Sequence, residues 1–104
     1  MGAQVADNPG EARYEIRSEG QLAGFAQYRL NDGRITFFHT EVDPGHEGAG
    51  LGGRLARAAL DDARARDLAV VPLCPFIAAY IRRHPDEYLD LVVPDMRDRV
   101  TGDG

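Results

Sequence analysis

The sequence contains no lysine, so all twelve of its positively charged side chains are arginine. Seventeen acidic residues outnumber them and give a formal net charge of -5. The arginines are interspersed with Asp and Glu, and no cluster of positive charge is present to neutralise the phosphates of a nucleic acid. The charge pattern therefore argues against a nucleic-acid partner and favours a cationic one, such as an amine. Without lysine, the chain has no side-chain amine of its own to modify.

Cysteine is also scarce, because Cys74 is the only one. A single cysteine excludes an internal disulfide and a cysteine zinc site, and neither His46 nor His84 has a metal-ligand partner at a useful spacing, so we expect no metal. The lone thiol predicts a reducing, cytoplasmic location. No apolar run approaches the roughly 20 residues of a membrane span, and we expect no membrane partner.

The length of 104 residues limits the chain to one core, since it cannot hold separate cofactor and substrate domains. We place this single domain at residues 13–94. Residues 1–12 are small and polar, without the basic start and apolar run of a signal peptide, and predict a disordered lead. Ala6 stands where a myristoylation motif requires Ser or Thr, so we expect no lipid anchor. Residues 95–104 are expected to be a frayed tail.

Three short runs with β-type composition follow the lead, at residues 13–18, 22–30 and 34–42. The last two are joined by Asn31-Asp32-Gly33, whose Asp-Gly step tolerates the positive φ angles of a hairpin turn. The run at 34–42 is aromatic and β-branched, and it is expected to return antiparallel to the run at 22–30.

The second half of the chain predicts a strand-helix-strand unit. After a break at residues 43–46, a helix is indicated by one apolar stripe: Leu51, Leu55, Ala58, Ala59 and Ala63. The continuously apolar run 69–73 predicts a buried strand, which the crossover should place parallel to the strand at 34–42. A second helix is expected from Pro75 to His84, and residues 89–93 are expected to form a last strand. The predicted class is α+β, with antiparallel N-terminal strands leading into one βαβ unit and a ligand crevice at the C-terminal ends of its strands.

Four glycines in residues 47–54, Glu-Gly-Ala-Gly-Leu-Gly-Gly-Arg, join the strand at 34–42 to the first helix. Glycine allows a ligand to approach the backbone closely, and free amides at a helix start form a cradle for a phosphate or pyrophosphate. The alternative is a flexible helix start without a ligand. The spacing of Gly48, Gly50 and Gly53 also fits the dinucleotide pattern, but the next strand ends in Leu73-Cys74 and supplies no acidic residue for a ribose.

The run Glu47-Gly48-Ala49-Gly50-Leu51-Gly52 resembles the acetyl-CoA-binding motif of the GNAT N-acetyltransferases, in which Glu47 replaces an Arg or Gln. Further along, Val71 to Phe76 (VPLCPF) and Tyr80 to Pro85 (YIRRHP), together with residues 39–42 (HTEV), are similar to a very small GNAT subgroup. This subgroup carries a cysteine at the end of the strand that follows the CoA helix. The resemblance covers about residues 14–93.

This resemblance implies a minimal GNAT-like fold and an acetyl-CoA-dependent N-acetyltransferase that needs no metal. Backbone amides of residues 40–42 would hold the pantetheine arm and polarise the thioester, while the glycine loop would bind pyrophosphate. The residues implied for the cofactor site are Thr40, Glu41, Val42, Glu47, Gly48, Ala49, Gly50, Leu51, Gly52, Gly53, Arg54, Cys74, Pro75, Phe76 and Tyr80.

Cys74 precedes Pro75, which suits the first position of a helix, so the cysteine is expected to be the cap residue. Unpaired amides at a helix start favour the thiolate form. The alternative is a buried, inert cysteine. The resemblance implies that Cys74 lies close to the thioester, where it either takes the acetyl group transiently or assists proton transfer; both remain open.

Three further residues are candidate catalytic groups. His39 lies near the end of the strand predicted to run parallel to that of Cys74, so imidazole and thiol can be expected to meet. The alternative is a histidine that is satisfied by backbone groups within the sheet. His39 or Glu41 would remove a proton from the amine. The resemblance implies that Tyr80 protonates the departing CoA thiolate, and the alternative for Tyr80 is packing of its helix on the sheet.

The function these residues predict is transfer of an acetyl group from acetyl-CoA to an amine. So small a chain has little material for a substrate lid, which favours an exposed amine on a protein or a polyamine-like molecule. One alternative is a CoA-binding sensor or interaction module without turnover. A further alternative is hydrolysis of CoA thioesters through Cys74 and His39. The sequence does not predict an oligomeric state.

Overall fold

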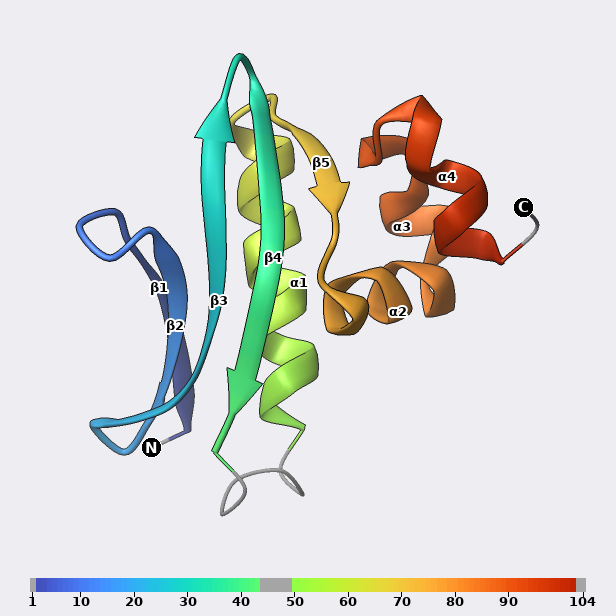
Figure 1. The fold of residues 1–104 in the computed structure, drawn as a ribbon. Coiled ribbons are helices and arrows are strands. Elements are labelled where there is room, and N and C mark those ends of the chain that lie inside the picture. Colours follow the sequence, from blue (N-terminus) through green and yellow to red (C-terminus); the bar gives the residue numbers. More distant parts are fainter. Residues whose placement is uncertain (1, 44–49, 103–104) are drawn as a thin grey trace.

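Five strands form one mixed sheet whose spatial order follows the chain (Figure 1). The computed structural model describes residues 2–43 and 50–102. The strands are β1 (Ala3–Asn8), β2 (Arg13–Ser18), β3 (Gln21–Asn31), β4 (Arg34–Val42) and β5 (Ala69–Pro72). The first four pair antiparallel, and β5 pairs parallel with β4. The predicted α+β class, hairpin turn and parallel strand are confirmed.

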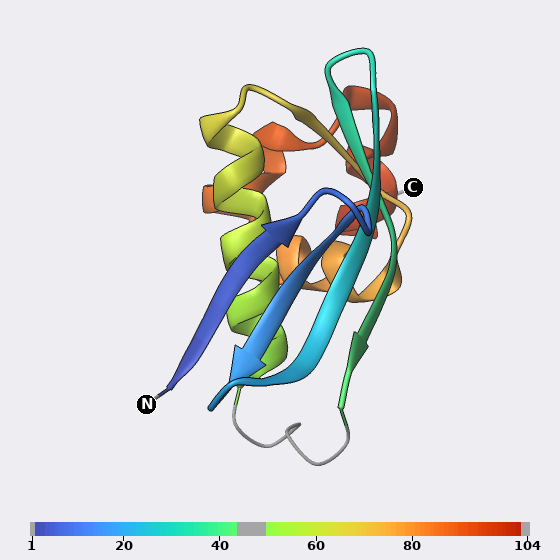
Figure 2. The same cartoon turned by 90° about the vertical axis from the view of Figure 1, so that its left-hand side faces the viewer.

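The helices gather on one face of this sheet and beside its β5 edge (Figure 1). They are α1 (Leu51–Ala65), α2 (Pro75–Arg83), α3 (Pro85–Tyr88), the 3-10 turn η2 (Leu89–Leu91) and α4 (Pro94–Thr101). Helix α1 lies against one face of the sheet and contacts all five strands (Figures 1 and 2). Helix α2 packs against α1, β4 and β5, and α4 packs against α2 and β5. Among residues 2–43 and 50–102, no helix has both the length and the apolar character needed to cross a membrane.

The core lies between α1 and the sheet. The buried side chains of α1 form one apolar face because they recur at helical spacing: Leu51, Leu55, Ala56, Ala59, Leu60 and Ala63. Ile35 and Phe37 of β4 are fully buried on the facing side of the sheet. The predicted stripe is thus confirmed except at Ala58, which is half-buried.

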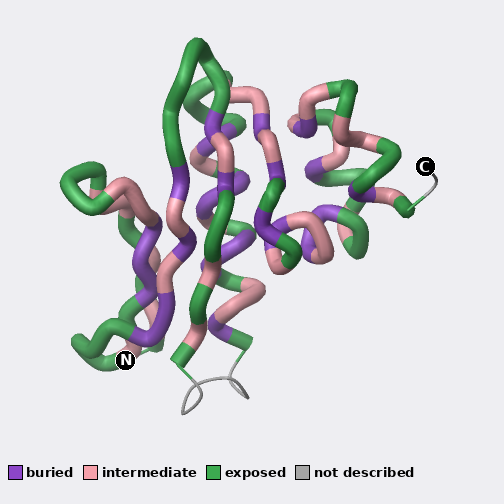
Figure 3. Tube along the Cα trace, viewed as in Figure 1, coloured by how far each residue is buried: buried purple, intermediate pink, exposed green. Residues whose placement is uncertain are grey.

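A β-bulge in β4 changes the alternation of its side chains. Gln27 pairs with His39 and Tyr28 pairs with Phe37, so Phe38 is an extra residue with no partner of its own in β3. An extra residue shifts the alternation by one position. Phe38 and His39 are therefore both exposed, while Thr40 and Val42 are half-buried. Figure 3 shows the resulting mixture of exposed and half-buried positions at the end of β4 that lies near the start of α1.

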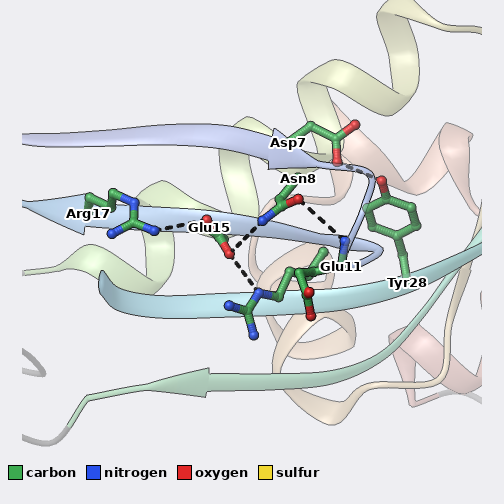
Figure 4. A network of polar contacts seen from close by, with 7 residues as sticks. Asp7, Asn8, Glu11, Glu15, Arg17 and Tyr28 are labelled. Carbon is green, nitrogen blue, oxygen red and sulfur yellow. Dashed lines mark hydrogen bonds and ion pairs between the residues drawn. The ribbon is translucent and has the colours of Figure 1, made fainter. Parts of the chain in front are cut away.

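The expected disorder of residues 1–12 is wrong for residues 3–8, which form β1 in register with β2. An edge strand needs only one partly apolar face, and Val5 packs against the core from there. Asp7 fixes the strand further, because the Tyr28 hydroxyl donates to its carboxylate at 2.6 Å. On the sheet face away from α1, Asn8 and Arg13 donate to the Glu15 carboxylate (Figure 4). The hydrogen bond from Arg13 lowers the pKa of Glu15 below its usual range.

Two expectations near the C-terminus are also corrected. Residues 89–93 do not form a strand: Leu89–Leu91 is a 3-10 turn, and only Val92 forms an isolated parallel bridge, with Val70. The expected frayed tail contains α4, which starts at Pro94 and ends at a left-handed Gly102. Proline pre-sets the φ angle of a first helical turn, and glycine accepts a left-handed cap at little cost. Val100 is buried, so α4 contributes to the core.

The free energy of unfolding is expected to fall between pH 10 and 12. Three tyrosines donate hydrogen bonds to aspartates on other elements: Tyr14 to Asp62, Tyr28 to Asp7 and Tyr88 to Asp61. Burial, reinforced by the carboxylates, raises the pKa of all three above 10, that of Tyr28 to about 12. A raised pKa contributes stability that is complete below the unfolded value and is lost as pH rises through the folded value.

Urea titrations across this pH range measure the effect. The chain has no lysine, so tyrosine is the side chain whose ordinary pKa lies near 10. The variant Tyr28→Phe should show a shallower loss of stability between pH 10 and 12 than the parent protein. An identical slope in both proteins would contradict the role given to Tyr28.

Candidate functional site

A pocket of about 310 Å3 lies where the end of β4 meets the first turns of α1 and α2. Its lining residues are Val42, Gly50, Gly52, Gly53 and Phe76. All five belong to the predicted cofactor-binding set. Three other members of that set, Glu47, Gly48 and Ala49, lie outside the described residues.

The pocket opens because β4 and β5 pair over only part of their lengths. Their parallel register ends at Phe37 and Pro72. The last backbone link across the pair is the Cys74 amide, which donates to the Phe37 carbonyl at 2.9 Å. Beyond Phe37 the chain of β4 runs on without β5, and α2 begins at Pro75. The site therefore lies at the C-terminal ends of two parallel strands, the crevice that the sequence predicts.

The start of α1 borders this pocket through Gly50, Gly52 and Gly53. Its cap residue, Gly50, has a left-handed backbone with φ 70°, and as a glycine it has no side chain to bond the first amides of the helix. The first amides of a helix have no partner within the helix, and the helix dipole adds positive potential there. The first turn carries no acidic side chain that would oppose an anion. The arrangement suits a phosphate or pyrophosphate group.

Gly52 lies directly against the Phe76 ring. A Cβ atom at this position would lie 2.5 Å from Cζ of Phe76, which is closer than non-bonded carbon atoms approach, so the ring would have to shift. The Phe76 ring thus packs directly on the α1 backbone. At the adjacent Gly53, a Cβ atom would meet only the Tyr80 ring, at an ordinary 3.7 Å. The missing side chain of Gly52 therefore sets the position of one pocket wall.

Cys74 occupies the predicted cap position of α2 and is buried. Its thiol does not cap the helix; it donates a hydrogen bond to Thr40 Oγ1 at 3.1 Å. The thiol therefore faces the end of β4, on the side where the β4–β5 pairing has stopped.

The expected meeting of His39 with Cys74 does not occur. The bulge turns His39 to the exposed side of β4, where its Nε2 lies 2.7 Å from the Glu41 carboxylate and its ring contacts Phe25. The side chains of His39 and Glu41 are about half-exposed, at 47% and 61%. The alternative of a histidine satisfied by backbone groups is also wrong, because its recorded hydrogen bond is to a carboxylate. His39 and Glu41 form an exposed pair on the face of β4 opposite to that of Thr40, which contacts Cys74.

Tyr80 lies on α2, and its side chain packs between α2 and α1. Its ring lies against Gly53, is stacked on His84 with centroids 4.3 Å apart, and is 5% exposed. A hydrogen bond with the Tyr80 hydroxyl raises the pKa of the exposed Arg57 guanidinium. Tyr80 does not line the pocket. It packs behind Gly53, which does line it. This placement agrees with the packing alternative.

Two contacts of the site are not predicted from the sequence. One is the hydrogen bond between Cys74 and the Thr40 hydroxyl, since Thr40 was expected to act through its backbone. The other is the packing of Phe76 on Gly52. No local pattern marks either, because each depends on how β4 and α2 meet. Among residues 2–43 and 50–102, no group of three or more His, Cys, Asp or Glu side chains is placed to hold a metal ion.

Sequence and fold comparisons identify the family of this chain. A model described as GCN5-related N-acetyl-transferase matches residues 13–91. The chain belongs to this family. Streptothricin acetyltransferase of Streptomyces lavendulae is 40% identical over 67 residues, which is 62% of this chain and 35% of that protein. The matched region thus spans about a third of the length of this relative.

Solved structures support the GNAT fold. The solution structure of a GCN5-like protein from Staphylococcus aureus has a TM-score of 0.63 and is 25% identical, and the match covers 86% of this chain and 87% of that chain. Ard1 from Thermoplasma volcanium has a TM-score of 0.52 at 21% identity, over 59% of this chain and 43% of its own, and is similar in fold alone. The GNAT-like fold and family resemblance predicted from the sequence are confirmed.

Proposed function

We propose that this GNAT protein transfers the acetyl group of acetyl-CoA to an exposed amine. The single observation that carries the proposal is the pocket between the end of β4 and the first turns of α1 and α2, in a chain of an acetyltransferase family. Family membership implies acyl transfer from acetyl-CoA, and the open helix start fits the anionic part of that molecule. The S. lavendulae relative is named for acetylation of streptothricin, which adds small-molecule amines to the acceptors to be tested.

The backbone of this chain would supply most of the binding. Amides of Gly50 to Gly53 would hold the pyrophosphate, with Arg54 adding charge, and amides of residues 40–42 would hold the pantetheine arm and the thioester carbonyl. When bound, acetyl-CoA supplies an activated acetyl group. Backbone donors directed at the carbonyl oxygen would stabilise the negative charge that develops there.

In the transfer, the amine nitrogen forms a bond with the carbonyl carbon and the bond from carbon to sulfur breaks. The amine loses a proton and the departing thiolate gains one. In this proposal, Glu41 or His39, which form an exposed pair, would accept the proton of an amine that arrives from solvent. Cys74 would either hold the acetyl group briefly or return the proton to the thiolate, and Tyr80 would support this site by packing behind Gly53.

A panel of amines tests the proposal. The purified protein is incubated with acetyl-CoA and with polyamines, lysine-containing peptides, peptide N-termini and small-molecule amines, and the products are detected by mass. Acetylated amine is the expected product. Binding of acetyl-CoA without any product would indicate a sensor or interaction module, and loss of acetyl groups without an acceptor would indicate hydrolysis.

Charge is expected to influence the choice of acceptor. With a net charge of -5 and an exposed Glu41, the protein should use cationic amines better than neutral ones. Raising the salt concentration from 50 to about 500 mM should lower kcat/KM for a polycationic acceptor severalfold, because exposed charges are screened. Affinity for acetyl-CoA, measured in parallel, should change less. Equal use of neutral acceptors with no effect of salt would contradict electrostatic selection.

The cytoplasmic location stays a prediction that rests on the lone cysteine. Fractionation of the source cells, with the protein detected by antibody, would test it.

A further inference from the structure

The Cys74 thiol donates a hydrogen bond to the hydroxyl of Thr40. Sγ and Oγ1 are 3.1 Å apart, and the contact joins residues that are 34 positions apart in the chain. Cys74 is 2% exposed, so few water molecules can replace this partner. In a buried site, a thiol or thiolate depends on protein groups for the stabilisation that water would otherwise give.

The bulge at Phe38 creates this contact. Phe37 points to the helix side of the sheet, and in a regular strand the next residue on that side would be His39. The extra residue moves Thr40 to that side instead and turns His39 away. Cys74 follows Pro72, the last paired residue of β5, by two positions. The bulge thus places Thr40 level with Cys74.

Two further contacts hold the cysteine in place. Its amide donates to the Phe37 carbonyl at 2.9 Å, and its carbonyl accepts from the Ala78 amide at 3.0 Å. Most polar cap residues turn their side chains to the open amides of their own helix. The Cys74 side chain makes no such bond and faces Thr40.

The pair lies next to the pocket on both of its elements. Val42 is two residues beyond Thr40 on the same side of β4, and it lines the pocket. Phe76 is two residues beyond Cys74, and it lines the pocket as well. Thr40 and Cys74 do not line the pocket themselves, but each is two residues from one that does.

We propose that Thr40 is a positioning residue for Cys74: its hydroxyl accepts a hydrogen bond from the thiol and donates one to the thiolate, so it orients the sulfur in both protonation states. A hydroxyl group has both a donor and acceptor sites, which fits this double role. The effect of Thr40 on turnover rests on the proposed acetyl transfer. The effect of Thr40 on the reactivity of the Cys74 thiol does not.

Thr40→Val and Thr40→Ser separate the hydroxyl from the shape of the side chain. Valine keeps the branched shape that suits a strand and removes the hydroxyl, whereas serine keeps the hydroxyl. Thr36→Val, on the same strand and also half-buried, is the matched control. The first readout is the rate at which iodoacetamide alkylates Cys74 between pH 6 and 10, followed by mass. Circular dichroism and thermal melts check that each variant folds.

Thr40→Val should slow alkylation about tenfold near neutral pH and move the pH–rate profile to higher pH, because the thiolate loses its donor. Thr40→Ser and Thr36→Val should react like the parent protein. In acetyl-transfer assays, Thr40→Val should lower kcat and leave KM for acetyl-CoA within about twofold, and serine should restore kcat.

Parent-like alkylation and turnover in Thr40→Val would overturn the proposal. A parent protein whose Cys74 reacts only after unfolding would overturn it as well. The alkylation rates also separate a failure of the proposed acetyl transfer from a failure of the role given to Thr40. If no amine is acetylated but alkylation follows the hydroxyl, the proposed function fails and the thiol partnership stands; if amines are acetylated and the variants behave alike, only the role of Thr40 fails.

Discussion

Replacing Gly52 with valine is expected to abolish the stabilisation of the protein by acetyl-CoA or CoA. A Cβ atom at residue 52 would lie 2.5 Å from Cζ of Phe76, so the ring must move from its place as a pocket wall. The parent protein should gain about 2.7 kcal/mol of apparent stability when the ligand is present at 100 times its dissociation constant. The variant should fold, because the ring is at the edge of the core, and should show no gain.

Gly53→Ala, at a neighbouring residue that also lines the pocket, is the comparison variant, because it adds a Cβ atom without a clash with Phe76. Its Cβ atom would meet the Tyr80 ring at 3.7 Å, an ordinary contact. It also removes a glycine from a helix, which should raise stability by roughly 0.5–1 kcal/mol. Thermal melts with and without ligand compare the three proteins. A full ligand shift in Gly52→Val would show that the pocket between α1 and α2 does not bind this ligand.

Cys74→Ala should lower acetyl transfer by about 100-fold or more, the usual size of an acid-base or nucleophilic contribution. The substitution removes one small buried group, so the fold and the affinity for acetyl-CoA should be retained. Cys74→Ser should also reduce transfer while it preserves the contact with Thr40 in part. Steady-state rates at saturating acetyl-CoA measure the effect. Unchanged turnover in Cys74→Ala would reduce the cysteine to a packing role and leave Glu41 and His39 as the chemical groups.

Intact-protein mass spectrometry distinguishes the two roles left open for Cys74. After brief mixing with acetyl-CoA, one added acetyl group that is absent in Cys74→Ala would indicate covalent transfer through the sulfur. The absence of this adduct during active turnover would indicate direct attack by the amine. The chain has no lysine, so an acetyl group on this protein has few other places to attach.

The central part of the fold could be predicted because its signals are local and strong. The Asp32-Gly33 step marks the hairpin between β3 and β4, and the stripe of Leu51 and Leu55 marks α1. Residues 69–72 form a strand parallel to β4, because the apolar run favours a strand and the helical crossover returns it in the same direction. The prediction that Cys74 is the cap residue at the start of α2 is confirmed, because Pro75 begins the helix as proline often does.

The ends of the domain could not be predicted from the same signals. β1 is an edge strand held by side-chain contacts such as that of Tyr28 with Asp7, and half of its own residues are polar. Helix α4 buries Val100 but has little apolar surface otherwise. Such elements are stabilised by tertiary contacts, so the apolar periodicity of the segment alone does not predict that a strand or helix forms there.

The arrangement of the catalytic candidates depends on one extra residue. Residue 38 is a phenylalanine, a type that does not mark a bulge as glycine or proline would. In a regular strand without the bulge, His39 would face the side of Cys74. The predicted meeting of His39 and Cys74 rested on their places near the ends of two neighbouring parallel strands, and it is wrong because the bulge turns the His39 side chain away. The glycine loop is different: Gly50 to Gly53 could be assigned to the pocket from the sequence, because their role depends on the local strand-to-helix connection.

The release of free CoA from acetyl-CoA, measured with and without an added amine, tests the central claim most directly. A thiol-reactive dye added after the reaction is quenched reports the free CoA, with the Cys74→Ala variant as a control for thiols of the protein. Acetyl transfer predicts release that depends on the amine and that matches the acetylated amine mole for mole. Release at the same rate without amine, or no release with any amine while acetyl-CoA binds, would contradict it.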